Sequence, residues 1–323
     1  MAIAQHTQPQ TLVPPKIALQ TSGLTQVHIK GPGDDDLGEG LDDGLDDLIR
    51  RHTAQRPEDK KAIEVIGERK FGELWVKYER ALNIVDTLKV DLIEEYLGKI
   101  ITDVLTPQDI EEFLKLTAAY ENSQYYQKCT TKIVNKLIEN SHTAGHSEFV
   151  LDTRNLLKPL DNLCTRLRAS GDKPINIIIN GTVGKDFGFS AGYSVSFTTN
   201  GDVGSCGYNS TCSNFTIKGN VDYISNPGNY SSFNIDGNLR AYSLGVSNNS
   251  SLTITGEIEE LEVSVYSKNC TFKTPNPKTL DVFLRRIPLF EGHKIYFINE
   301  EGNEKQVGMF ERFVKRVGYK LKK

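Results

Sequence analysis

The chain lacks several features that would assign it to a common class of protein. Its 323 residues include only five cysteines, and their spacing fits neither a zinc knuckle nor a disulfide framework. Lysine and arginine total 38 against 42 aspartate and glutamate, and the net charge of −4 argues against a dedicated nucleic-acid-binding protein. No apolar stretch approaches membrane-spanning length, and the first residues show no secretory-signal pattern. We therefore expect free thiols and a cytoplasmic protein with no membrane partner.

Sequence motifs for catalysis are also missing. The chain has no phosphate-binding loop, dinucleotide fingerprint or nucleophile elbow. His142 and His146 have the spacing of two metal ligands on one helix face, but Gly145 lies between them. The sequence offers only Glu139 and Glu148 as candidates for a third metal ligand beside these histidines. We interpret the histidine pair as a helix exit, and we assign no catalytic, cofactor-binding or metal-binding residue.

The second half of the chain contains a motif that occurs five times. Each copy reads apolar-x-apolar-x-Gly-x-apolar, and the glycines are 20, 18, 18 and 19 residues apart. A period near nineteen, with alternating apolar residues inside each unit, is typical of a β-solenoid. The glycines form a column that consists of Gly181, Gly201, Gly219, Gly237 and Gly256.

The repeat also predicts how each coil uses its residues. The apolar side chains point inward and form continuous columns when successive coils stack about 4.8 Å apart. We expect the glycine column to mark a bend that needs positive φ and has no room for a Cβ. Left-handed hexapeptide helices need a six-residue subperiod, which this sequence does not contain. We therefore predict a single-stranded, right-handed β-solenoid.

Two columns of outward residues accompany the glycines. The residues one position after each glycine predict a ladder of polar side chains. In the column three positions after each glycine, the last three residues are charged and predict a ladder of mixed sign. The first column is Thr182, Asp202, Asn220, Asn238 and Glu257, and the second is Gly184, Gly204, Asp222, Arg240 and Glu259.

The first two coils resemble a known glycine-rich domain. Ile179-Asn-Gly-Thr-Val-Gly184 and Thr199-Asn-Gly-Asp-Val-Gly204 are each followed by a Gly/Ser-rich turn. This pattern is similar to the right-handed β-helix domain found in glutamate synthase large subunits and in one of the subunits of formylmethanofuran dehydrogenase. Later coils depart from it, because Asp222, Arg240 and Glu259 replace the second glycine. In those families the domain is structural, so the resemblance implies packing and assembly rather than an active site.

The sequence upstream of the repeat predicts a tail and a helical domain. Residues 1–40 have little apolar periodicity and an acidic end, which is typical of a disordered tail. Residues 41–146 have helical periodicity, and we assign their apolar stripe to an intramolecular bundle. Thr106 is the expected N-cap of one helix. The stripe consists of Leu74, Tyr78, Ala81, Val85, Leu88 and Leu92.

The repeat and the C-terminal segment complete an α+β multidomain chain. Residues 147–290 are predicted to form the β-solenoid, with capping helices at Leu156–Arg168 and Lys278–Arg286. Residues 291–323 are predicted to form a β-hairpin and a basic tail.

From this architecture we expect a non-enzymatic interaction or assembly protein that binds one or more protein partners. One alternative is a carbohydrate-active β-helix lyase or hydrolase, for which Asp202 and Asp222 are the conceivable carboxylate pair. A second alternative is a solenoid that polymerises end to end, but the expected caps argue against it. A basic cluster is the candidate for docking an acidic partner, nucleic acid included. It consists of Arg312, Lys315, Arg316 and Lys320.

Overall fold

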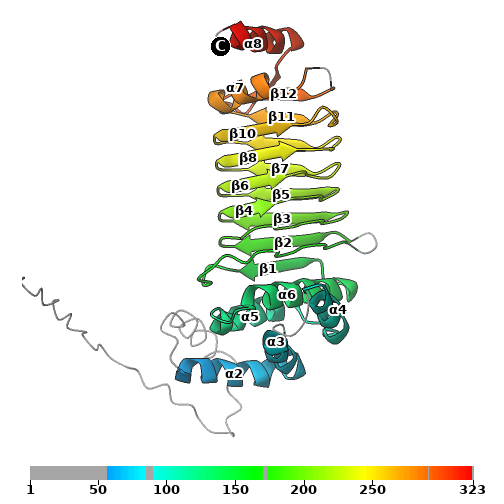
Figure 1. The fold of residues 1–323 in the computed structure, drawn as a ribbon, viewed down its shortest axis with the longest axis vertical. Coiled ribbons are helices and arrows are strands. Elements are labelled where there is room, and N and C mark those ends of the chain that lie inside the picture. The colour runs from blue at the N-terminus through cyan, green and yellow to red at the C-terminus, as the bar shows by residue number, and fades with distance from the viewer. Residues whose placement is uncertain (1–56, 85–89, 170–172, 290, 322–323) are drawn as a thin grey trace, which may run out of the picture. The chain divides into compact units, whose positions relative to one another are not determined.

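The structure, a computed structural model, describes residues 57–84, 90–169, 173–289 and 291–321. Its helical region is followed by a parallel β-solenoid of about 6 turns between residues 175 and 297, and then by an antiparallel pair of strands. The fold class expected from the sequence is confirmed (Figure 1). The tail predicted at 1–40 lies outside the described residues.

The helical region is built around an aromatic cluster. Phe113 contacts Trp75 and Tyr78 edge to face, with ring centroids 5.9 and 5.5 Å apart, and all three side chains are buried. Leu74, Tyr78 and Ala81 of the predicted stripe are buried here, whereas Val85, Leu88 and the Leu92 side chain lie outside the described part of the chain. The helices are α2 Pro57–Phe71, α3 Glu73–Ile84, α4 Val90–Ile100, α5 Pro107–Thr117, the short 3-10 helix η2 Ala118–Tyr120, and α6 Tyr126–Thr143.

Two helix ends follow the expected local chemistry. Thr106 is the N-cap of α5, and its hydroxyl accepts a hydrogen bond from the Asp109 N–H at 3.2 Å. At the end of α6, Gly145 adopts φ +109° and its N–H donates to the carbonyl of His142 at 2.9 Å. The sequence therefore determined both ends.

The solenoid has two sheets, whose strands pair in parallel except for the antiparallel pair β12–β13 at the end of sheet A. In sheet A the order is β1-β2-β3-β5-β7-β9-β11-β12-β13, and in sheet B it is β10-β8-β6-β4. Sheet A comprises β1 Glu148–Asp152, β2 Ile175–Asn180, β3 Val195–Asn200, β5 Ser213–Ile217, β7 Ser232–Ile235, β9 Ser251–Ile254, β11 Thr271–Thr274, β12 Lys294–Ile298 and β13 Glu304–Gln306. Sheet B comprises β4 Val203–Cys206, β6 Val221–Ser225, β8 Leu239–Leu244 and β10 Ile258–Val263.

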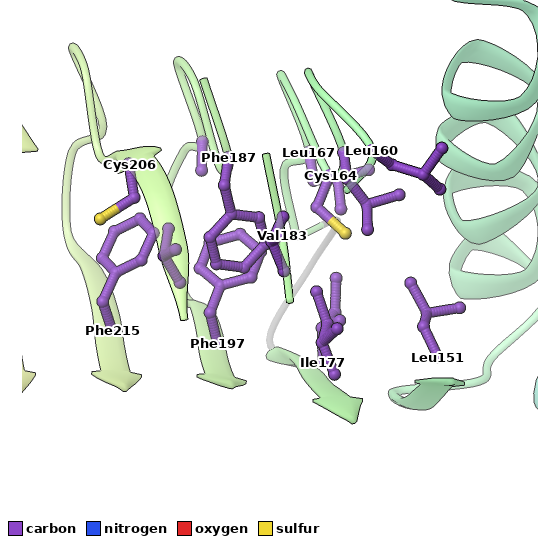
Figure 2. Packing of buried hydrophobic residues seen from close by; sticks show 14 of the residues in the cluster. Leu151, Leu160, Cys164, Leu167, Ile177, Val183, Phe187, Phe197, Cys206 and Phe215 are labelled. Carbon is purple, nitrogen blue, oxygen red and sulfur yellow. The ribbon is translucent and has the colours of Figure 1, made fainter. Parts of the chain in front are cut away.

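The register of sheet A follows the sequence repeat residue for residue. Phe197 pairs with Phe215, and Phe215 pairs with Phe233, each on the next strand. The Phe215 and Phe233 rings stack with centroids 4.7 Å apart, the ordinary distance between neighbouring strands. Figure 2 shows Phe197 and Phe215 pointing across the core toward Phe187 and Cys206. The predicted inward columns are therefore present.

The prediction of a capping helix at Leu156–Arg168 is wrong. This segment is a run of turns, with φ near +60° at Asn162, Cys164 and Arg166. Its backbone bonds go to the next coil: the Asn162 N–H donates to the Lys185 carbonyl, and the Arg166 N–H to the Phe189 carbonyl, both at 2.7 Å. Inward apolar residues recur here every three or four positions because of these turns, and that spacing imitates a helix.

Helices α5 and α6 border the first coil instead. Helix α5 packs against β1. From α6, the amide of Asn135 donates to the Asn162 carbonyl at 3.2 Å and accepts from the Cys164 N–H at 2.7 Å. The turn segment is not helical, so these backbone groups have no helical hydrogen bonds. The side-chain amide of Asn135 satisfies them instead.

The other expected elements at the C-terminal end are present. Helix α7, Pro277–Arg286, begins at Asn276, whose side chain accepts from the Lys278 and Thr279 N–H groups at 2.9 and 3.3 Å. The hairpin is the antiparallel pair β12 and β13, and Gly302 turns it with φ +81°. The predicted basic tail contains a further helix, α8 Met309–Leu321, which packs on α7.

Candidate docking surfaces and structural columns

The glycine column is a line of close backbone contacts between coils. A Cβ added to Gly237 would lie 2.2 Å from the Gly219 carbonyl oxygen, and one added to Gly201 would lie 2.4 Å from that of Gly181. Positive φ, the other expected reason, applies only to Gly181 at +121°. For Gly201, Gly219, Gly237 and Gly256 that part of the explanation is wrong, and the absence of room for a Cβ is the reason for glycine.

The polar ladder beside the glycines is a chain of side-chain-to-backbone hydrogen bonds. Asp202 Oδ1 accepts from the Asn220 N–H at 2.7 Å, and Asn220 Oδ1 accepts from the Asn238 N–H at 3.0 Å. Asn238 Oδ1 then accepts from the Glu257 N–H at 2.8 Å, and Glu257 forms an ion pair with Lys278 of α7. Each side chain thus bonds the backbone of the next coil.

The charge ladder is exposed and loosely paired. Arg240 Nε lies 3.7 Å from Asp222 Oδ1, and both side chains are more than half exposed. An ion pair this exposed contributes little to stability. Asp202 and Asp222, the conceivable catalytic pair, thus contact different partners: the Asn220 N–H and the Arg240 guanidinium.

The histidine pair is arranged as a helix exit. The Nδ1 of buried His142 hydrogen-bonds the His146 carbonyl at 2.9 Å. In the described parts of the chain, no group of three His, Cys, Asp or Glu side chains is placed to hold a metal ion. Glu139 forms an ion pair with Lys136.

An open cleft of about 530 Å³ lies between the start of α5 and the loop that leads into β1. His146, Glu111 and Glu148 line it. The sequence pattern identifies His146 and Glu148 only as candidate metal ligands. It does not predict the cleft, because the cleft depends on how α5 packs against β1.

The five cysteines are free thiols. Burial raises the pKa of the Cys164 and Cys206 thiols well above the usual value, and it raises that of Cys129 to about 11. Thiols with raised pKa values are poor nucleophiles, so these three residues serve as core side chains.

The two described side chains of the predicted basic cluster differ in exposure. Arg312 has 4 % of its surface exposed, and its guanidinium donates to the carbonyls of His293 at 2.9 Å and Pro288 at 2.7 Å. Lys315 is exposed on the same helix, and the side chains of Arg316 and Lys320 lie outside the described part of the chain. Arg312 therefore fastens α8 to the end of the solenoid and is not exposed for docking an acidic partner.

Comparison with known proteins finds no matching family model, curated protein or solved structure. The resemblance of the first two coils to glycine-rich β-helix domains therefore extends only to the parallel β-solenoid itself.

Proposed function

We propose that this chain is a non-enzymatic interaction protein whose β-solenoid is a rigid scaffold within a larger assembly. The observation that supports this best is the use of outward polar side chains. Asp202, Asn220 and Asn238 direct their oxygens to the backbone of the following coil. A wall whose polar groups stabilise coil stacking suits a fixed binding surface more than an acid–base centre.

The enzyme alternative lacks comparable support. A glycosidase needs two carboxyl groups that face one bond of the substrate. Here Asp202 bonds a backbone N–H, and Asp222 lies beside Arg240. The Asp202 contact joins two coils and the exposed Asp222 ion pair adds little to stability, and neither contact requires a substrate.

The end-to-end polymer is disfavoured by the elements at the two ends of the stack. Helix α5 lies against β1, and β13 pairs antiparallel with β12. A second solenoid would have to displace one of them to continue the parallel sheet. Protected edges of this kind are how β-proteins avoid edge-to-edge association.

The scaffold proposal is tested by mapping partner contacts on the two outer walls. A photo-crosslinking residue is placed at Thr216 on sheet A or at Tyr223 on sheet B, both of which point outward, and the labelled protein is exposed to native extract. We expect one wall to yield a stoichiometric partner. Affinity is then measured with the purified partner, using Arg240→Glu as the variant on the sheet B wall and Thr216→Lys on the sheet A wall.

The affinity should fall only for the variant on the wall that cross-links. The same protein is incubated with a panel of polysaccharides. Turnover that is lost in Asp202→Asn or Asp222→Asn would replace the scaffold proposal with the enzyme alternative. Equal partner affinity in both wall variants would contradict a docking role for the solenoid.

A further inference from the structure

Helix α8 is attached to the protein by its polar side. Arg312 is buried, and its two hydrogen bonds to the His293 and Pro288 carbonyls tie this side to the segment between α7 and β12. Surface helices normally place an apolar stripe against the protein and charged residues toward solvent. Among the α8 side chains that the structure describes, the buried one is an arginine, so the usual arrangement is reversed at the start of this helix.

The apolar side chains described at the start of α8 face solvent. Phe310 is 80 % exposed, Phe313 52 % and Val314 51 %. Their positions differ by three and four residues, so they lie on one face of the helix, and the sequence repeats these steps with valine at 317 and leucine at 321. Helix α8, at the C-terminal end of the chain in Figure 1, therefore begins with an exposed apolar face that includes two phenylalanines.

The same segment is strongly basic. Residues 309–323 contain six lysines or arginines and one glutamate, in a chain whose net charge is −4. One of the six is Arg312, the buried anchor. Lys315 is exposed next to the apolar stripe. An exposed apolar face with an exposed lysine beside it, in a basic segment, is complementary to a surface that offers both hydrocarbon and negative charge.

We propose that α8 is a docking helix for an anionic lipid membrane. Phe310, Phe313 and Val314 would enter the headgroup region while Lys315 contacts acidic lipids. The expectation of no membrane partner rested on the lack of a spanning segment. None of the helices that the structure describes is long and apolar enough to cross a membrane, but a helix that lies in the interface needs only one apolar face.

Charge and geometry favour the membrane over two other occupants. A second copy of α8 would bring two strongly basic segments together, and their repulsion opposes pairing. A protein that wraps around its target helix would need the side that Arg312 already fastens to backbone carbonyls. A membrane contacts only the exposed side.

The test uses the full chain and sedimentation with two kinds of vesicle. One kind contains phosphatidylcholine with 30 mol % phosphatidylserine as the probe composition, on the order of the acidic content of an anionic leaflet, and the other phosphatidylcholine alone. We expect binding to the acidic vesicles, at least about tenfold weaker binding to the neutral ones, and a marked decrease in binding at high salt.

Two variants probe the two halves of the surface. Phe310→Ser with Phe313→Ser should lower the affinity for acidic vesicles at least about tenfold, because both rings would leave the interface. Lys315→Glu should lower it more than about fivefold. The matched control is Val246→Ser with Val265→Ser, since these solenoid side chains are 69 % and 62 % exposed but lie outside the basic segment. The control should bind like the parent.

Circular dichroism should show that all variants melt like the parent, because every substituted side chain is exposed. Absence of binding to acidic vesicles, or equal loss in the control, would overturn the proposal. A dimer that dissociates in the double phenylalanine variant would assign α8 to self-association instead. Binding of an acidic protein without vesicle binding would assign it to a protein partner.

Discussion

The helical region and the solenoid bury aromatic rings in two different ways. In the helical region, Phe113 contacts Phe71, Trp75 and Tyr78 edge to face, so one ring joins residues from three helices. In the solenoid, Phe215 stacks between Phe197 and Phe233, which belong to the preceding and following strands of sheet A. The first arrangement is a cluster that depends on all its helices, and the second is a column in which each coil depends mainly on its neighbours.

The largest expected effect comes from truncating one ring in each region. Phe113→Ala and Phe215→Ala should each lower the free energy of unfolding by about 3–5 kcal/mol, because both rings are fully buried. Amide hydrogen exchange should distinguish the two variants by which segments lose protection. Phe113→Ala should raise exchange throughout α2, α3, α5 and α6, and Phe215→Ala mainly in the coils next to β5. Uniform exchange over the whole chain in either variant would contradict the comparison.

A smaller effect is expected from the glycine column, where the backbones of successive coils approach each other closely. Gly237→Ala should cost about 2–4 kcal/mol, because its Cβ would lie 2.2 Å from a backbone oxygen that cannot rotate away. Gly308→Ala is the control, since nothing lies within 4 Å of its added Cβ. Urea denaturation measures both variants. Equal stability of Gly237→Ala and the parent would show that the coils separate freely.

The pH dependence of stability should distinguish the last coil from the helices. Burial, and then the Arg312 charge, lower the pKa of His293 to about 4 from its usual 6.5. The unfolded chain thus binds a proton more readily than the folded one. Stability from this group is complete above pH 6.5 and is lost as the pH falls to about 4, by at most about 3 kcal/mol.

His293→Gln should remove this part of the pH dependence, because glutamine does not titrate. Unfolding at a series of pH values measures it in both proteins. Identical slopes for the parent and the variant between pH 6.5 and 4 would contradict the assignment.

The smallest effect should come from one bond of the polar ladder. Asn220→Ala removes the acceptor of the Asn238 N–H, and we expect a cost of about 1 kcal/mol. The control is Asn214→Ala, an exposed asparagine on the outer face of sheet A, which should change stability by less than about 0.5 kcal/mol. A loss for Asn220→Ala as large as that for Phe215→Ala would mean that the ladder, and not the core column, holds the coils together.

Several site features could be predicted from sequence because they depend on local spacing. The pairing of Phe197, Phe215 and Phe233 results from the repeat, since a residue two positions along a strand returns to the same face. The order of Asp202, Asn220 and Asn238 in a ladder results from it in the same way. The spacing did not reveal that their oxygens accept from backbone N–H groups, because this depends on the distance between turns of successive coils.

Other features were misread because one spacing suits two structures. Leu160, Leu163 and Leu167 are spaced like one face of a helix, but they are the inward residues of a turn segment bonded to the next coil. Arg312 belongs to a basic stretch in sequence, yet the open carbonyls of Pro288 and His293 make it a buried anchor. Neither outcome is encoded in periodicity, since both depend on backbone groups that are distant in sequence.

The sequence by itself determined the coil: its period, its inward residues and the need for glycine beside each bend. These properties result from strand alternation and from the fixed distance between neighbouring strands, which act within one repeat and its neighbour. Only the tertiary structure decided which elements border the first coil and how α8 is oriented. Both depend on which backbone groups remain without partners at the ends of the stack, and side chains such as Asn135 and Arg312 meet those groups only after the chain has folded.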